Sequence, residues 1–191
     1  MTDRPDRIAI DVGKVLRTAT SLRANLITRP TGRAVRLAIQ TQLQGVGTLS
    51  VSVIDFSEVA LIDFSCADEV VAKLLQEYLT EETRDAFFVL RGVHEPHRDQ
   101  IEEVLERHGL AAVAETEPGL FLLLGVRTEP EESAWVLLEE RGRVDEQHVG
   151  EVFGSPDGEA ALTSLVHRGL AFRSPTSGRV HSLSRLVAEL M

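Results

Sequence analysis

The sequence predicts an α/β domain with a mixed sheet and helices, followed by a small, mainly α domain. Strand-like and helix-like segments alternate over residues 1–126, which is typical of sheets whose parallel strands are joined by helical crossovers. Residues 127–132 are polar and contain Pro130, which predicts a linker. In the last part, 133–191, short helix-like segments precede a single hairpin.

Strands are predicted where apolar, β-branched runs occur. Residues 7–12 alternate between apolar and polar with the period of a strand, and 48–56 are rich in Val and Ile. Residues 86–90 form a third apolar run, and 59–62 a shorter apolar piece. Two closing strands, 110–114 and 120–124, flank a Glu-Pro-Gly turn.

Helices are predicted where apolar residues recur with a period near 3.6. In the first domain they are expected from about Thr31 to Gly45, after Asp63 to about Leu79, and from near Pro96 to Gly109. In the second domain a helix around Trp135 ends at 141–142. A second helix begins after Asp145, a third after Ser155, and a last one reaches residue 191 beyond a hairpin over 170–183.

The composition is that of a globular protein, and the charge is unevenly distributed. The net charge of −10 is unfavourable for general nucleic-acid binding. Residues 1–36 have 8 basic and 3 acidic residues, 37–128 have 6 and 16, and 129–191 have 6 and 11. The single cysteine, a charged N-terminal segment and the lack of a long apolar run predict a cytoplasmic protein without membrane contact.

A short central segment resembles a known family. The run from Val53 to Val70 has a strand that ends in Asp55, a short apolar piece and a turn at Asp63 and Ser65 that opens a helix. It resembles the central motif of STAS domains, the anti-sigma-factor antagonists. Ser65-Cys-Ala-Asp-Glu69 is similar to a run in a STAS-like subfamily of unassigned function, as is the Thr-Arg pair before the first helix. The resemblance covers residues 7–125.

The resemblance implies a protein partner, such as a regulator or a kinase-like protein, that binds at this turn. The turn that binds the partner, which could also be a phosphorylation switch, would consist of Asp63, Ser65, Cys66 and Asp68. In the anti-sigma antagonists, phosphorylation of a serine directly after the Asp controls binding, but Phe64 stands there in this chain. Ser65 is the nearest hydroxyl, and Asp68 and Glu69 would repel a phosphate, so we expect Ser65 to act as a helix N-cap.

The second part of the chain resembles winged helix-turn-helix domains. The resemblance covers 133–191 and is clearest where Leu162–Leu170 leads into the hairpin. It implies DNA contact through side chains of the third helix and the wing, namely Thr163, His167, Arg168, Arg173 and Arg179. The third helix begins with Asp157, Gly158 and Glu159, which would repel phosphates, so we expect protein contact in preference to DNA contact.

Three further groups of residues are of types that could bind a ligand or take part in catalysis. A group of arginines near the N-terminus could contact an anion or a partner protein, namely Arg23, Arg29, Arg33 and Arg36. The alternative, which we favour, is that they form ion pairs with the acidic residues of 37–128. Cys66 is expected to be a buried structural residue, with no base nearby to activate it. His94 and His97 are expected to be solvated, since Pro96 lies between them and no third ligand follows.

We therefore expect a non-enzymatic regulator without metal or cofactor, which acts through protein–protein interaction of its STAS-like domain in transcription or signalling. The main alternative is a transcription regulator whose winged helix binds DNA, with the STAS-like domain as sensor or dimeriser. An enzyme that uses Cys66 is least favoured. A homodimer is left open, and the sequence identifies no partner or effector.

Overall fold

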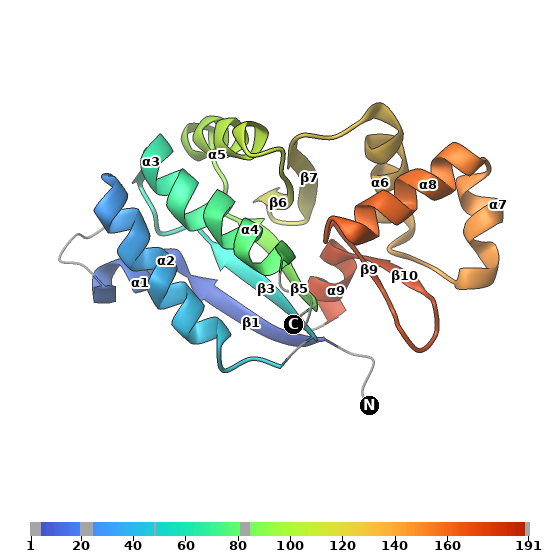
Figure 1. The fold of residues 1–191 in the computed structure, drawn as a ribbon, viewed down its shortest axis with the longest axis horizontal. Coiled ribbons are helices and arrows are strands. Elements are labelled where there is room, and N and C mark those ends of the chain that lie inside the picture. The colour runs from blue at the N-terminus through green and yellow to red at the C-terminus, as the bar shows by residue number, and fades with distance from the viewer. Residues whose placement is uncertain (1–4, 20–24, 48, 81–84, 190–191) are drawn as a thin grey trace.

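A mixed five-stranded sheet forms the centre of the N-terminal part of the molecule (Figure 1). The computed structural model describes residues 5–19, 25–47, 49–80 and 85–189. The strand order is β1-β3-β5-β6-β7, in which the first four strands are parallel and β7 is antiparallel to β6. The strands are β1 (Asp6–Asp11), β3 (Leu49–Asp55), β5 (Asp85–Arg91), β6 (Ala111–Glu117) and β7 (Leu120–Gly125). The predicted α/β fold with a mixed sheet is confirmed.

Helices cover one face of this sheet. They are α1 (Val12–Ala19), α2 (Arg29–Leu43), α3 (Phe64–Ala67), the π-helix η1 (Asp68–Ala72), α4 (Lys73–Thr80) and α5 (Glu95–Arg107). Alternate strand residues such as Ile54, Phe88 and Leu90 join the helices in one buried cluster. Within the described ranges, no helix is long and apolar enough to cross a membrane.

Helix α1 is not among the helices expected from the sequence, although Val12, Val15 and Leu16 recur at helical spacing. Val15 and Leu16 are buried, so the helix is amphipathic and packs into the core. Gly13 lets the chain approach the loop after β3, since a Cβ at Gly13 would lie 2.5 Å from Glu58 Cβ. Glycine destabilises a helix through its conformational entropy, but here it permits the close contact with Glu58.

The C-terminal unit, residues 129–189, contains helices and a small three-stranded antiparallel sheet of order β8-β10-β9. Its elements are α6 (Glu129–Arg141), β8 (Arg143–Val144), η2 (Glu146–His148), α7 (Val149–Phe153), α8 (Pro156–His167), β9 (Ala171–Arg173), β10 (Val180–Ser182) and α9 (Leu183–Glu189). The predicted cap of the third helix is present, because Ser155 Oγ accepts a hydrogen bond from the Gly158 amide at 3.0 Å.

Most of the expected linker is helical. Residues 127–132 were predicted as a linker, but α6 begins at Glu129. Thr128 and Glu131 form a capping box, in which the Thr128 amide donates to Glu131 Oε2 at 2.8 Å and the Glu131 amide donates to Thr128 Oγ1 at 3.3 Å. Pro130, which suggested a loop, lies in the first turn, where its missing N–H costs nothing.

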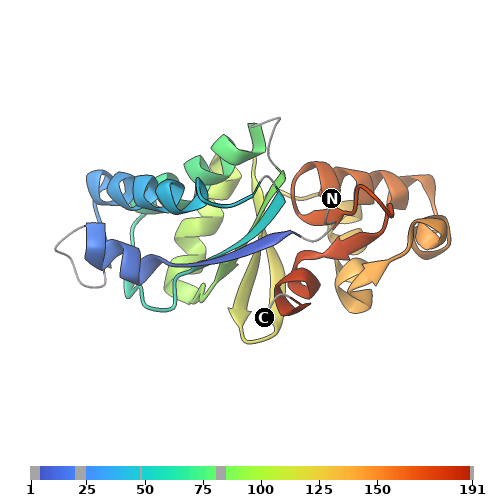
Figure 2. The same cartoon turned by 90° about the horizontal axis from the view of Figure 1, so that it is seen from below.

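The C-terminal unit packs against part of the other face of the central sheet. Val51, Val53 and Val89 point away from the helices and belong to a second buried cluster with residues of α6, α8 and α9. The rings of Phe87 in β5 and Phe172 in β9 pack edge to face, with centroids 5.5 Å apart. Figure 2 shows α9 beside the sheet. The two parts of the chain thus share this second buried cluster.

This shared core predicts a single unfolding transition. In urea, the fluorescence of Trp135, the only tryptophan, and the far-UV circular dichroism of the whole chain should change together. Phe172→Ala should lower the free energy of unfolding by about 3–5 kcal/mol, because it leaves a cavity between the units. Leu120→Ala, at an exposed position, is the control, with a change of about 0.5 kcal/mol or less. A tryptophan transition that precedes the circular dichroism transition in the wild type would show separate cores.

Candidate partner-binding site

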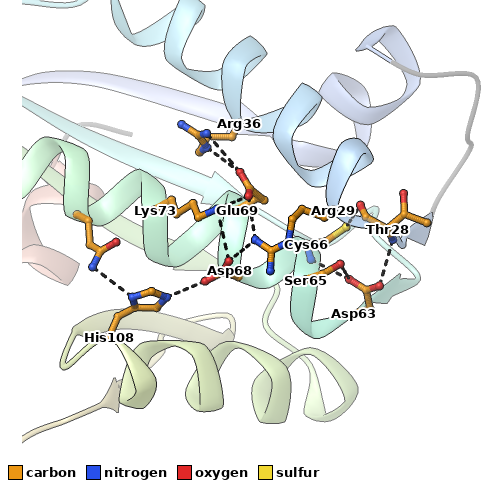
Figure 3. Close-up of polar contacts among 11 residues, drawn as sticks. Thr28, Arg29, Arg36, Asp63, Ser65, Cys66, Asp68, Glu69, Lys73 and His108 are labelled. Atoms are coloured by element: carbon orange, nitrogen blue, oxygen red, sulfur yellow. Dashed lines mark hydrogen bonds and ion pairs between the residues drawn. The ribbon is translucent and has the colours of Figure 1, made fainter.

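The turn that opens α3 is held by the side chain of Asp63, which is the N-cap of the helix (Figure 3). Its Oδ1 accepts hydrogen bonds from the Ser65 hydroxyl at 2.9 Å and the Cys66 amide at 2.8 Å. Partial burial favours the neutral form, but these donors outweigh burial and lower the pKa of Asp63. The expectation that Ser65 caps the helix is wrong, because Ser65 is its second residue and Asp63 precedes the first turn.

The segment before α2 completes this turn from the other side. The Thr28 amide donates to Asp63 Oδ2 at 3.1 Å, and the Thr28 carbonyl accepts from the Cys66 thiol at 3.0 Å. Thr28 makes both contacts with a φ of 76°, which is uncommon for a residue other than glycine. The two segments that carry the STAS resemblance, separated by more than thirty residues, therefore contact each other directly.

Cys66 is a packing residue at this contact. It is fully buried, and a Cβ at Gly32 of α2 would lie 2.9 Å from Cys66 Cα, so only glycine allows the two helices to approach so closely. Burial and the neighbouring Asp63 carboxylate raise the pKa of the thiol to about 12. The thiol therefore stays protonated near neutral pH, whereas a nucleophilic cysteine needs a lowered pKa.

Two neighbouring carboxylates, Asp68 and Glu69, are buried where the helix changes to the π-turn η1, with 6% and 2% of their surface exposed. Arg29 Nη1 lies 2.6 Å from Asp68 Oδ2 and 3.0 Å from Glu69 Oε1. Arg36 Nη2 lies 3.3 Å from Glu69 Oε2, and Lys73 bonds to Glu69. Burial favours protonation, but the cations and their hydrogen bonds lower the pKa of both carboxylates (Figure 3).

A histidine extends the cluster to the end of α5. His108 Nε2 lies 2.7 Å from Asp68 Oδ1, and Gln76 Nε2 lies 3.2 Å from His108 Nδ1. On the opposite side, Arg36 Nη1 lies 3.5 Å from Glu77 Oε2. The polar network thus joins α2, η1, α4 and the residue after α5 (Figure 3).

The structure separates the three arginines that were candidates for anion or partner contact. Arg29 and Arg36 pair with Asp68, Glu69 and Glu77, as the internal-pairing interpretation expected. Arg33 is exposed, and it forms no ion pair with any of the residues that the structure describes. Arg29 remains half-exposed despite its two carboxylate partners. Arg23 lies outside the described residues.

Two exposed apolar side chains lie beside the turn, and the sequence did not indicate them. Ile27 and Leu61 are 42% and 52% exposed. The short strands β2 (Asn25–Leu26) and β4 (Leu61–Ile62) pair in parallel, with Asn25 opposite Leu61. Ile27 follows β2 directly, and Leu61 is the first residue of β4. We call Ile27, Leu61, Arg29 and Arg33 the docking surface.

The side chains predicted to contact DNA are largely engaged within the chain. Arg168 Nη1 lies 2.9 Å from both carboxylate oxygens of Glu131, and its Nη2 donates to the Val126 carbonyl. Partial burial favours the neutral form of Glu131, but hydrogen bonds from the Ser164 hydroxyl, the Thr128 amide and Arg168 lower its pKa to about 2. Arg179 pairs with Asp145.

Of the remaining predicted DNA contacts, Thr163 is exposed but donates its hydroxyl hydrogen to the Glu159 carbonyl at 2.9 Å. His167 is exposed and Arg173 half-buried. No ion pair of either is found among the described residues. The structure therefore leaves these two as the candidate DNA contacts that make no internal polar bond in the described part of the chain.

The two histidines near the start of α5 differ from expectation. His94 is exposed and precedes the helix, but His97 is buried, with Nε2 3.4 Å from the Ala60 carbonyl. The prediction that both are solvated is wrong for His97, because its position in the first turn faces the loop after β3. In the described part of the chain, no three His, Cys, Asp or Glu side chains gather in a way that could hold a metal ion.

No family model, no curated protein and no solved structure matches this chain.

The buried carboxylates predict a large effect of a small substitution. Glu69→Gln keeps the shape of the side chain but leaves Arg29, Arg36 and Lys73 without a shared anion. It should lower the free energy of unfolding by about 3 kcal/mol near neutral pH. Glu77→Gln, at a half-exposed ion pair in the next helical segment, should change it by about 1 kcal/mol or less. Urea denaturation of both variants measures the difference.

The difference in unfolding free energy between the wild type and Glu69→Gln should decrease as the pH falls. Because the pKa of Glu69 is lowered below its ordinary value of 4.5, its contribution to stability is present above that pH and is lost as the pH falls through the folded-state pKa. The stability curves of the wild type and Glu69→Gln should therefore converge in acid. A difference between them that stays constant from neutral pH to strong acid would contradict the assigned role of the charge.

Proposed function

We propose that this chain is a regulatory protein that acts by binding another protein at the docking surface, through an N-terminal STAS-like domain. The single observation that supports this best is the exposure of Ile27, which follows β2, and Leu61 in β4, next to the α3 turn. Large apolar side chains grouped on a surface are common in protein interaction sites.

The rigidity of the turn favours binding. Asp63 accepts three hydrogen bonds and the Cys66 thiol donates a fourth, so the backbone on either side of the docking surface is fixed before a partner arrives. A preorganised surface loses little conformational entropy on association. The partner that would fit has apolar side chains to cover Ile27 and Leu61, and acidic groups that face Arg29 and Arg33.

Phosphorylation of Ser65 is not part of the proposal. Its oxygen lies 2.9 Å from Asp63 Oδ1, so an added phosphate would face a carboxylate whose lowered pKa keeps it charged. Like charges at this distance would repel each other, and the turn would have to rearrange.

For the C-terminal unit we propose a winged-helix fold that contacts protein in preference to DNA. The first turn of α8 contains Asp157 and Glu159, and Arg168 and Arg179 are already paired with carboxylates. Few cations are thus left for phosphates, and affinity for DNA depends mainly on such contacts.

The docking surface can be tested by affinity capture from cells that naturally produce the chain. Ile27→Asp and Leu61→Asp each place a carboxylate in the apolar patch and should reduce capture of the partner by about tenfold or more. Val136→Asp, at an exposed apolar position on α6, is the matched control and should capture as much as the wild type. A partner retained equally by all four proteins, or no protein retained preferentially by the wild type, would contradict the proposal.

DNA binding is measured by fluorescence anisotropy with a mixed-sequence duplex at low and near-physiological salt. We expect no binding at either salt concentration, because the surface of α8 is acidic at its start. Binding that weakens steeply with salt, and further in Arg173→Ala and Arg179→Ala, would instead support the DNA-binding regulator.

A further inference from the structure

A cavity of about 470 Å³ opens where β3, β5 and β6 end. It is lined by Ser57, Arg91, Gly92, His94 and residues 115–118. Its volume is within the range of about 300–1,000 Å³ that is usual for small-molecule sites. Ligands of α/β proteins bind beyond the carboxyl ends of the parallel strands, which is where this cavity lies. None of the residues of the docking surface belongs to it.

One arginine in the cavity is held in place by a single side-chain hydrogen bond, and its other donors face the cavity without a partner among the described residues. Arg91 in β5 and Glu115 in β6 are cross-strand neighbours, and Arg91 Nε donates to Glu115 Oε2. Glu115 Oε1 accepts from the Gly119 amide at 3.1 Å, so the carboxylate is fixed as well. The Arg91 and Glu115 side chains are 24% and 12% exposed. Arg91 Nη1 and Nη2 bond to none of the described residues.

The wall beside Arg91 is rigid and largely apolar. Gly92 has a φ of +68°, and a Cβ there would lie 2.4 Å from Ser57 Oγ, so the loop after β5 packs directly on the loop after β3. The Gly92 amide donates to the Glu115 carbonyl at 3.1 Å, and the Gly92 carbonyl accepts from the His94 amide at 3.1 Å. Pro118 contributes an apolar surface on the β6 side.

We propose that this cavity binds a small organic carboxylate. The ligand carboxylate would accept hydrogen bonds from Arg91 Nη1 and Nη2, the free edge of a guanidinium whose orientation Glu115 fixes. Its apolar body would lie against Gly92 and Pro118. Glu95 begins α5 and Glu117 also lines the cavity, so the free edge of Arg91 is the group that would recognise the ligand carboxylate.

The test uses matched acids and amides as probes. Benzoate and hexanoate should bind with a Kd of about 1 mM or tighter, and benzamide and hexanamide at least about tenfold more weakly. Amide ¹H–¹⁵N spectra locate the site, and the Gly92 and Gly119 signals should shift with the acids. Equal binding of acid and amide, shifts elsewhere only, no binding of either acid, or tighter binding of inorganic phosphate would each overturn the proposal.

Two arginine variants distinguish a loss of carboxylate binding from a loss of folding. Arg91→Lys keeps the positive charge near Glu115 but loses the guanidinium fork, so benzoate affinity should fall about tenfold. Arg98→Lys, a surface position on α5 whose Nε lies 3.6 Å from Glu102, should bind benzoate like the wild type. Far-UV circular dichroism confirms that both variants are folded. An unchanged benzoate affinity in Arg91→Lys would exclude Arg91 as the recognising group.

Discussion

The burial of two adjacent carboxylates is the constraint on which the N-terminal part of the structure depends. Asp68 and Glu69 follow each other in a helical segment, and a buried charge without compensation is costly by several kcal/mol. Cations of α2 and α4 compensate them, and His108 after α5 forms a hydrogen bond with Asp68. The position of α2 against η1 is thereby fixed, and with it the Thr28–Asp63 contact and the exposed side chains beside it. A structural charge cluster thus determines the geometry of the proposed docking surface.

The central sheet imposes a second constraint. Parallel strands are usually buried on both faces of their sheet, and helices α1 to α5 cover only one face here. The C-terminal unit buries part of the other face, where Phe87 packs against Phe172 and residues of α6, α8 and α9 join the same cluster. The hydrogen bond from Arg168 to the Val126 carbonyl adds a polar contact near the junction. The same residue was a candidate for DNA contact, so its structural role reduces what the unit can offer to DNA.

Much of the fold could be predicted from the sequence, because the strands at 49–55 and 85–91 are apolar or β-branched runs and the longer helices have a clear hydrophobic period. Elements of two residues, such as β2, β4 and β8, have no measurable period, and α1 is too short for a reliable one. Pro130 was misinterpreted because proline is equally suited to a loop and to the first turn of a helix.

The candidate site was predictable only in part. The residue types at Asp63 and Cys66 indicate a helix start and a buried thiol. The partners of Arg29 and Arg36 lie more than thirty residues away and depend on tertiary structure. The exposure of a side chain has no local signal in the sequence either. The exposure of Ile27 and Leu61 was therefore not predicted, and His97 was wrongly expected to be solvated.

The most direct measurement is photo-crosslinking in the cells that naturally produce the chain, with p-benzoylphenylalanine introduced at Leu61 or, as a control, at Val136. Both positions are exposed, so each probe can be accommodated without disturbing the core. Binding at the docking surface predicts a defined crosslinked partner from position 61 that is absent from position 136. The same partner crosslinked only from position 136, or none from position 61, would contradict it.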